Sequence, residues 1–383
     1  MKRMTLLCVG PSGVPRTGQS IATETWITTS SHRIIHVGNN FEGRANFVRL
    51  LKTTTLPFRV FLRTIRSRPA GMYLSLKRSI PGAFADLLCV IAFRSIARGP
   101  VLVHLHGADL KEMQSSHLAR AIVVLIWKAV TDVIVLSPRM VDQLEGLPDK
   151  CVHVIPNFSA RMASEDVIQA KTKKLETEPL RVLYLSNIMF TKGFSYLVDA
   201  IRMLRAEGVN IGLTLAGRPL DDEIMSANEA IDLLNGVLGD GINYLGVLNG
   251  QEKWRQLEGA HVVALPTFYP IEAQPLCLIE GMAFGAVPLT TRHNYNEDFL
   301  DPRSALFVAP QDATAIADAL RALHSNRCET WTRMKLAAQI AYDLHRVEGY
   351  TDAIDRVAYE AVMRRLNLAT NSAAPRRHNG IRD

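Results

Sequence analysis

The chain has 383 residues, of which 48% are hydrophobic and 21% are charged, and its formal net charge at pH 7 is +7. This composition excludes an intrinsically disordered chain, and the length favours two domains over one. The apolar runs fall well short of the roughly 20 residues that a membrane-spanning helix needs. The five cysteines are scattered without a CxxC pair. Such a set indicates reduced thiols in a cytosolic protein, not a disulfide framework or a zinc site.

Short apolar runs alternate with helical patterns through the first part of the chain. Runs of this length, rich in β-branched and aliphatic residues, are typical of βαβ units around a parallel sheet. We therefore predict six parallel strands in this part. They span Thr5–Val9, Arg33–Val37, Met72–Leu76, Val101–His106, Asp132–Leu136 and Cys151–Ile155.

Residues 160–179 are polar and charged and end in proline, which indicates a linker between domains. The alternation then restarts and predicts a second sheet of six strands. They span Arg181–Leu185, Ile211–Ala216, Ile242–Leu245, His261–Leu265, Ala286–Thr290 and Ala305–Val308. The pattern predicts an α/β protein with two Rossmann-like domains that face an interdomain cleft. The cleft should lie at the carboxyl ends of the strands, where such sheets bind ligands.

The domain boundaries follow from this alternation. We assign residues 1–165 to an N-terminal Rossmann-like domain and residues 178–345 to a C-terminal one. A last amphipathic helix over residues 346–368 is expected to pack back on the N-terminal domain. Residues 369–383 are predicted to form a disordered tail.

A glycine-rich segment follows the first predicted strand and precedes a helix. Gly13 and Gly18 let the backbone approach a ligand closely, and the helix N-terminus favours an anion. Residues 13–20 nearly match GxxxxGK[ST], but Gln19 stands in place of the lysine that reaches the phosphates. Three interpretations stay open: a degenerate P-loop, a tight strand-to-helix turn, and a loop that lines the interdomain cleft.

Two histidines lie near the carboxyl end of a predicted strand, His104 and His106. Strand alternation places both side chains on one face of the sheet, with His106 nearer the cleft. A zinc site would need further ligands with matching spacing, and the neighbouring sequence offers none. His106 is therefore a candidate catalytic residue. The alternative is a histidine satisfied by a backbone carbonyl.

Two cations follow strands of the second predicted domain. Lys192 precedes Gly193 at a strand-to-helix turn, where a phosphate could meet both the ammonium and backbone N–H groups. Arg218 follows the next strand and could reach the same anion. Each residue has a plainer interpretation, a solvated loop lysine and a surface arginine.

Glu272 and Glu280 stand eight residues apart, with Pro275 between them. The pattern predicts Glu272 on a loop and Glu280 in the first turn of the next helix, both facing a ligand across that turn. Carboxylates near a nucleotide can accept hydrogen bonds from ribose and sugar hydroxyls. The alternative is a glycosidase-like carboxylate pair. We predict no metal site, because the chain lacks an Asp-x-Asp clamp; the acidic run 221–223 is interpreted as a charged helix N-terminus.

The segment from Arg44 to Arg98 holds eleven Lys or Arg residues against one acid, Asp86. Such a block suggests an anionic partner. Within it, Phe58 and Ile65 belong to an apolar set interleaved with arginines, which suits a helix at a membrane surface. The alternative is a solvated helix face.

Together these segments resemble the family 4, or group 1, retaining glycosyltransferases, which have the GT-B fold. The resemblance runs from about residue 4 to 345. The family's E-x7-E signature corresponds to Glu272–Glu280, followed by Gly281-Met-Ala-Phe-Gly285. Val154-Ile-Pro-Asn157 and Ala264-Leu-Pro-Thr267 also fit. One departure is that Ser186 and Asn187 stand where the family often has a Gly-Arg pair whose arginine binds the diphosphate.

The resemblance implies roles for individual residues. Lys192 would meet the donor diphosphate, Glu280 the ribose, and Glu272 the donor sugar. His106 would sit at the reacting centre, and Arg218 could replace the missing arginine. The remaining residues expected at the donor are Asn187, Gly18, Pro275 and Leu276. The N-terminal domain would bind the acceptor and the C-terminal domain the donor.

The resemblance therefore implies a retaining, metal-independent hexosyltransferase in polysaccharide biosynthesis. It would move a sugar from a UDP- or GDP-linked donor to a glycan or lipid-linked acceptor, with no cofactor. The alternatives are a nucleotide-sugar epimerase of the same fold and a degenerate P-loop nucleotide-binding module. We expect no nucleic-acid partner. We expect a cytoplasmic location, extending to the inner face of the cell membrane if residues 44–98 bind lipid.

Overall fold

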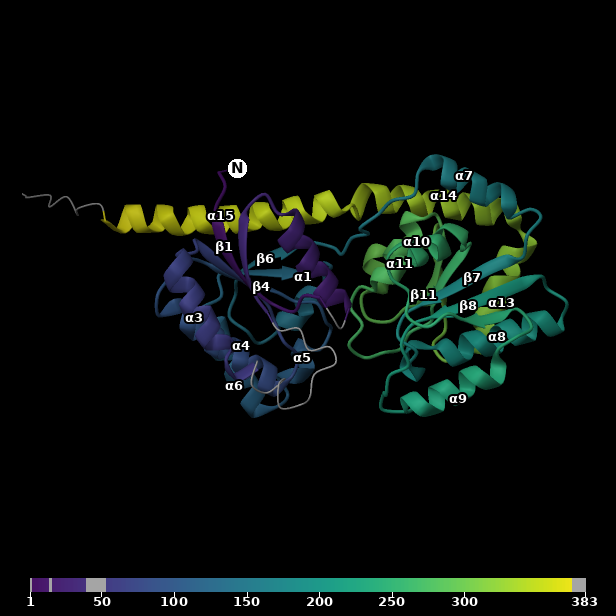
Figure 1. Ribbon diagram of the computed structural model, residues 1–383, viewed down its shortest axis with the longest axis horizontal. Helices are drawn as coiled ribbons and strands as arrows, with labels where there is room; N and C mark the ends of the chain where they lie inside the picture. The colour runs from purple at the N-terminus through teal and green to yellow at the C-terminus, as the bar shows by residue number, and fades with distance from the viewer. Residues whose placement is uncertain (1, 14–15, 39–52, 374–383) are drawn as a thin grey trace, which may run out of the picture.

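The computed structural model describes residues 2–13, 16–38 and 53–373, which form two α/β domains side by side (Figure 1). The first sheet is parallel throughout and has the strand order β2-β1-β3-β4-β5-β6. Its strands are β1 (Thr5–Val9), β2 (Arg33–Val37), β3 (Gly71–Ser75), β4 (Val101–His104), β5 (Asp132–Val135) and β6 (Cys151–Val154). The predicted strand 101–106 thus ends two residues early, and His106 lies on the loop that follows it. Residues 14–15 of the glycine-rich segment, and Arg44, Arg49 and Lys52 of the basic block, lie outside the described residues.

The second sheet is also parallel and has the order β12-β11-β10-β7-β8-β9. Its strands are β7 (Leu180–Leu185), β8 (Ile211–Ala216), β9 (Ile242–Tyr244), β10 (Val262–Leu265), β11 (Val287–Thr291) and β12 (Leu306–Val308). All twelve predicted strands are confirmed, with end points that differ by at most two residues. The expected linker contains a helix, α7 (Glu165–Lys174), which contacts α10 (Gly250–Gly259) and α14 (Arg327–Leu344).

Strand alternation gives the first sheet two apolar faces. Leu7, Leu74 and Val103 belong to the core beneath α3 (Leu56–Ser67), α4 (Ile80–Arg94) and α6 (His117–Trp127). The neighbours of these residues in sequence pack into a second core, beneath α1 (Gly18–Thr29) and α15 (Val347–Ala373). This sandwich of helices on both faces explains why the strands read as continuous apolar runs.

In the second domain, α8 (Phe194–Ala206) and α13 (Ala313–Ser325) pack together, and α11 (Leu276–Ala283) packs against β10 and α14. The remaining helical segments are α5 (Leu110–Met113), η1 (Arg139–Leu144), η2 (Phe190–Lys192), α9 (Ala227–Val237) and α12 (Asn296–Phe299). Among the described helices, none is both long and apolar enough to cross a membrane.

The chain crosses between the domains twice, and the two crossing segments pair with each other. Ser159 N donates to the carbonyl oxygen of His345 at 2.8 Å, and the His345 ring bonds the carbonyl oxygen of Asn157 at 2.7 Å. After the second crossing, α15 runs along the first domain and contacts α1 (Figure 1). It ends at Ala373, five residues beyond the end that we expected.

Asp355 fastens α15 to the first domain. This fully buried carboxylate accepts from Trp26 Nε1 at 2.8 Å, from the Ser30 hydroxyl at 2.7 Å, and from both the backbone N–H and the hydroxyl of Ser31. A charged acceptor with several donors is among the stronger hydrogen-bonding arrangements in a protein interior.

We expect Asp355→Ala to lower the free energy of unfolding by about 3–5 kcal/mol, because four donors lose their charged acceptor. The midpoint of urea unfolding measures this loss. Asp352→Ala is the matched control, since Asp352 lies one turn earlier on the same helix and is exposed. Equal effects of the two substitutions would show that Asp355 does not anchor the helix.

His261 is buried and directly precedes β10. Its Nδ1 accepts a hydrogen bond from Arg181 N at 3.1 Å. Burial, with nearby positive charges acting in the same direction, lowers the pKa of His261 to about 3. The unfolded chain titrates a histidine near 6.5. Below pH 6.5 the unfolded state therefore takes up a proton that the native state does not, and stability is lost as the pH falls towards 3.

We expect His261→Gln to reduce the loss of stability between pH 6.5 and 5 by up to about 1.4 kcal/mol per pH unit. Urea unfolding at pH 7.5, 6 and 5 measures this slope in both proteins. Other titrating groups also change the free energy of unfolding with pH, in either direction. The readout is therefore the difference in slope between the parent protein and the variant. His117→Gln, at an exposed position, serves as the control. A slope unchanged by His261→Gln contradicts the assignment.

Candidate active site between the two domains

The loops at the carboxyl ends of the two sheets meet each other. Ala108 N, on the loop after β4, donates to the carbonyl oxygen of Ile271, on the loop after β10, at 3.3 Å. Gly18, the first residue of α1, faces Leu276, the first residue of α11; a Cβ at Gly18 would lie 3.7 Å from Leu276 Cδ1. The structure therefore brings the loop that carries His106 against the loop after β10, and Gly18 against Leu276, across the boundary between the domains.

Lys192 and Glu272 form an ion pair in this region. Lys192 Nζ donates to Glu272 Oε2 at 2.9 Å, and both side chains are nearly buried, with 12% and 13% exposed. Burial alone would lower the pKa of Lys192, but the charge and hydrogen bond of Glu272 outweigh it and raise that pKa. Lys192 therefore carries its charge in a sheltered position, beside the ring of Tyr269.

The turn that carries Lys192 is held in place through the residues on either side of the lysine, Thr191 and Gly193. Asp222 accepts from the backbone N–H and the hydroxyl of Thr191, at 2.8 and 2.9 Å. Gly193 has φ +79°, and a Cβ there would lie 2.2 Å from the carbonyl oxygen of Pro266. Only glycine allows this approach. Our interpretation of the acidic run 221–223 is corrected for Asp222, because its carboxylate braces the lysine turn.

Glu280 engages a different lysine. It is the fifth residue of α11, so our prediction of a first-turn position is wrong by one turn. Its carboxylate is buried and accepts from Lys253 Nζ, on α10, at 2.6 Å. Burial raises the pKa of Glu280, and Lys253 offsets part of that rise. Lys253 was not among the predicted site residues, because nothing near it in the chain marks it as a partner of Glu280.

The start of α11 offers backbone donors. Pro275 is its N-cap residue and makes no side-chain capping bond, so the first N–H groups of the helix have no such partner. Leu276 follows as the first helical residue. The N-terminus of a helix favours an anion. The position facing it, Gly18, carries no side chain that could fill this space.

His106 is partly exposed, but its Nε2 atom is buried and lacks a hydrogen-bond partner within the described residues. Its ring lies on that of His104, with the centroids 4.0 Å apart, which confirms that they share a face. His104 Nδ1 bonds the Tyr73 hydroxyl at 2.7 Å. Burial lowers the pKa of His106 to about 3, and the charge of Arg78 acts in the same direction. His106 is thus a neutral imidazole at physiological pH.

A narrow cavity beside His106 is also lined by Arg78 and Asp109. Arg78 Nε lies 3.8 Å from Asp109 Oδ2. The charge of Arg78 also reaches Tyr269 in the second domain, where it opposes the rise in pKa that burial causes. Arg78 was absent from our predicted site residues because it appeared only as one cation of the basic block.

Gln19 has a structural partner at the end of β3. Its side-chain amide donates to Ser75 Oγ at 2.8 Å and to the carbonyl oxygen of Leu76 at 3.3 Å. These bonds hold the start of α1 against the sheet, in the position where a P-loop would place a phosphate-binding lysine. The contact favours the interpretations as a turn or a cleft-lining loop over a degenerate P-loop.

Arg218 lies on a turn that packs against the turn after β7. Its carbonyl oxygen accepts from Ile188 N at 2.9 Å, and the neighbouring Asn187 carbonyl accepts from the Tyr184 hydroxyl at 2.7 Å. The Arg218 side chain is exposed. Arg218 thus lies beside Ser186 and Asn187, where the family often has a Gly-Arg pair.

Within the described residues, no group of three or more His, Cys, Asp or Glu side chains could hold a metal ion.

Two Rossmann-like domains with facing carboxyl edges define the GT-B fold. Comparison with solved structures agrees: HepE of Anabaena in complex with UDP-glucose superimposes with a TM-score of 0.72 at 17% identity, covering 94% of this chain and 100% of that one. Sucrose-phosphate synthase of Thermosynechococcus elongatus gives a TM-score of 0.74 at 17% identity, covering 96% and 100%. At these identities the likeness concerns the fold alone.

In sequence, residues 166–341 match the family model of group 1 glycosyl transferases. The amylovoran biosynthesis glycosyltransferase AmsK of Erwinia amylovora is 25% identical over 158 residues, which cover 40% of this chain and 38% of that protein. The O-antigen chain mannosyltransferase C of Escherichia coli is 23% identical over 251 residues, 64% of each chain. The match thus spans less than two thirds of the length of each curated relative.

Proposed function

We propose that this protein is a retaining glycosyltransferase of the hexosyltransferase type. It transfers a sugar from a nucleotide-sugar donor to a glycan or lipid-linked acceptor in polysaccharide biosynthesis. The observation that carries the proposal is the pair of sheltered ion pairs, Lys192–Glu272 and Lys253–Glu280, beside the open N-terminus of α11. The names of the two curated relatives, which refer to amylovoran and O-antigen, support the choice of process.

On this proposal the donor replaces one ion pair by another. Glu272 neutralises Lys192 while the site is empty. A diphosphate that meets Lys192 and the N–H groups of α11 takes over as the counter-ion, which frees the Glu272 carboxylate to accept from hydroxyls of the donor sugar. Glu280 stays paired with Lys253 and accepts from the ribose with its other oxygen. Asn187, Pro275 and Leu276 complete the donor surface.

Retention without a protein nucleophile fits the groups available. The bond between the sugar carbon and the diphosphate breaks, the acceptor oxygen bonds that carbon on the same face, and a diphosphate oxygen takes the acceptor proton. Lys192 and the helix N-terminus stabilise the leaving diphosphate. His106 lies across the cleft as a neutral imidazole that can hydrogen-bond the sugar. We expect no metal or cofactor requirement, so transfer should persist in EDTA.

A donor screen tests this function. Thermal unfolding is measured with UDP-, GDP- and ADP-sugars, followed by sugar release or transfer with each donor that binds. Stabilisation by one nucleotide class supports the proposal, with UDP- or GDP-sugars expected. Stabilisation by none of them overturns it. An epimerase instead converts the donor without releasing nucleotide, and product analysis separates the two outcomes.

We further propose that α3 meets an anionic membrane surface at the cytoplasmic face, where a lipid-linked acceptor would be found. Phe58 and Ile65 are 62% and 44% exposed on this helix, alongside the exposed Arg63 and Arg66. Other cations of the block serve the fold, since Arg59 donates to the carbonyl oxygen of Gly38. Flotation with anionic liposomes tests the idea; an Arg63→Glu/Arg66→Glu variant that floats as well as the parent protein would refute it.

A further inference from the structure

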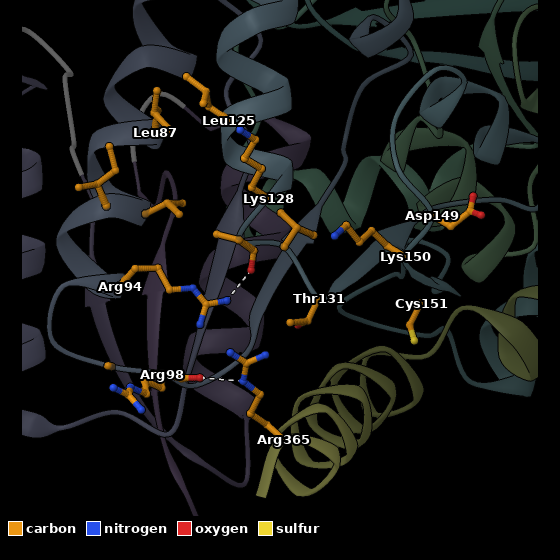
Figure 2. A pocket seen from close by; sticks show the side chains of 15 residues that line it. Leu87, Arg94, Arg98, Leu125, Lys128, Thr131, Asp149, Lys150, Cys151 and Arg365 are labelled. Atoms are coloured by element: carbon orange, nitrogen blue, oxygen red, sulfur yellow. Dashed lines mark hydrogen bonds between the residues drawn. The ribbon is translucent and has the colours of Figure 1, made fainter. Parts of the chain in front are cut away.

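A separate groove lies at the amino ends of β4, β5 and β6. His106 lies at the opposite end of this sheet, beyond the carboxyl end of β4. Its volume is about 1100 Å³. The walls come from the ends of α4 and α6, the segment 149–151 at the start of β6, and Arg365 of α15 (Figure 2). The proposed sugar transfer uses none of these residues.

The groove is strongly basic. Five cations and one acid line it: Arg94, Arg98, Lys128, Lys150, Arg365 and Asp149. Figure 2 shows the side chains of Arg94, Lys150 and Arg365 pointing towards a common space. Like charges that converge in this way repel each other, and an anion between them would relieve the repulsion.

The cations differ in how far the fold already uses them. Arg94 donates to the carbonyl oxygens of Gly99, at 2.6 Å, and Ala129, so it ties together the ends of α4 and α6. Among the described residues, Arg365 donates from its Nε alone, to the carbonyl oxygen of Arg98 at 3.1 Å. Within the part of the chain that the structure describes, Lys128 and Lys150 form no ion pair. Their charges are available to a ligand.

The groove also has an apolar side. Leu87 and Val90 form a buried floor, while Ile91 and Leu125 stand at the rim, 54% and 46% exposed. The same two helices carry further exposed apolar side chains away from the groove, namely Phe84, Leu88 and Leu118. A fully polar anion would leave this apolar rim in water. An anion joined to hydrocarbon would cover it.

We propose that this groove binds the phosphate headgroup of an anionic membrane phospholipid, while Ile91, Leu125 and their apolar neighbours on α4 and α6 enter the interfacial region. Lys150 and Arg365 contact the phosphate, and Lys128 lies at the rim. The contact holds the first domain against the lipid surface through a site distinct from the reaction centre. It rests on the proposed transfer of sugar to a lipid-linked acceptor and does not need the cations of α3.

Flotation of the full chain with phosphatidylcholine vesicles, with or without phosphatidylglycerol, tests the groove. We expect binding only with phosphatidylglycerol, and at least tenfold weaker binding for Lys128→Glu/Lys150→Glu/Arg365→Glu. The control, Lys173→Glu/Lys174→Glu/Arg202→Glu, changes the net charge equally at exposed positions of α7 and α8. We expect less than a twofold effect from it. Equal losses in the two variants would mean unspecific attraction and would overturn the proposal.

The α3 variant Arg63→Glu/Arg66→Glu separates this proposal from the one on α3. If it alone loses vesicle binding and the groove variant keeps it, the groove is not a lipid site. If the groove variant alone loses binding, the groove proposal stands without α3. Nucleotide-sugar binding, followed by thermal shift, should be unchanged in the groove variant, so a failed donor screen and a failed groove test are distinguishable.

Cys151 provides a second readout, since its exposed thiol lines the groove. An environment-sensitive fluorophore is attached to Cys151 in a Cys328→Ser background, which removes the other exposed thiol. We expect its emission to shift to the blue with phosphatidylglycerol vesicles and not with glycerol 3-phosphate. A response to glycerol 3-phosphate but not to vesicles would identify a soluble phosphate site and overturn the lipid assignment.

Discussion

Replacing Lys192 by alanine is expected to lower kcat/KM for sugar transfer by about 10²–10³-fold, the usual effect of removing one charged group that stabilises a transition state. The substitution removes the ammonium that pairs with Glu272 at 2.9 Å and that would bind the donor diphosphate. It also leaves Glu272 free to repel an approaching diphosphate. Steady-state kinetics with the donor found in the screen, together with donor titration, measure the loss.

Arg218→Ala is the informative comparison for Lys192→Ala. The backbone of Arg218 packs against Ile188, next to Ser186 and Asn187, where the family often has its second cation. If Arg218 replaces that cation, its loss should weaken donor binding by about 1.5–3 kcal/mol, as expected of a charge-assisted contact. If Arg218→Ala leaves donor binding and turnover intact while Lys192→Ala abolishes them, Arg218 has no such role.

Glu280→Ala should lower both stability and donor binding. Glu280 is the buried partner of Lys253, whose side chain is only 18% exposed. Removing the carboxylate leaves that ammonium buried without its counter-ion, which typically costs about 3–5 kcal/mol. Urea unfolding measures the stability, and titration with the nucleotide measures ribose recognition. A nearly unchanged unfolding midpoint would contradict the pairing.

The double variant Glu280→Ala/Lys253→Met separates the two effects. Methionine keeps much of the length of the lysine chain without its charge, so the double variant should recover most of the lost stability. It should not recover donor binding, because the acceptor for the ribose hydroxyls is still missing. Recovery of both would mean that Glu280 acts on the donor only by keeping α11 folded.

The order of strands and helices could be predicted from local pattern. Parallel strands that are covered on both faces must be apolar along their whole length, so runs such as Val101–Val103 and Val262–Leu265 stand out from their surroundings. The ends of the strands leave no such signal in the sequence. Leu105 is as buried as the strand residues, and nothing in the sequence separates it from β4. The placement of His106 on a loop was therefore missed.

Part of the candidate site could also be predicted from the sequence, because Lys192-Gly193 and Glu272–Glu280 are short local motifs. The ion-pair partner of each charged residue could not be predicted. Glu272 lies 80 residues from Lys192, and Glu280 lies 27 residues from Lys253 on a different helix. Arg78 and Gln19 likewise acquire their surroundings from elements far away in the chain.

By itself, then, the sequence determined two parallel α/β domains and a set of anion-binding candidates, since apolar periodicity and glycine turns act over a few residues. Only the tertiary structure decided which lysine each glutamate meets and that Asp222 braces the Lys192 turn. It also joined Lys150 and Arg365 into one basic groove. Such contacts depend on how β-sheets and helices pack across long separations, and local patterns carry no record of that packing.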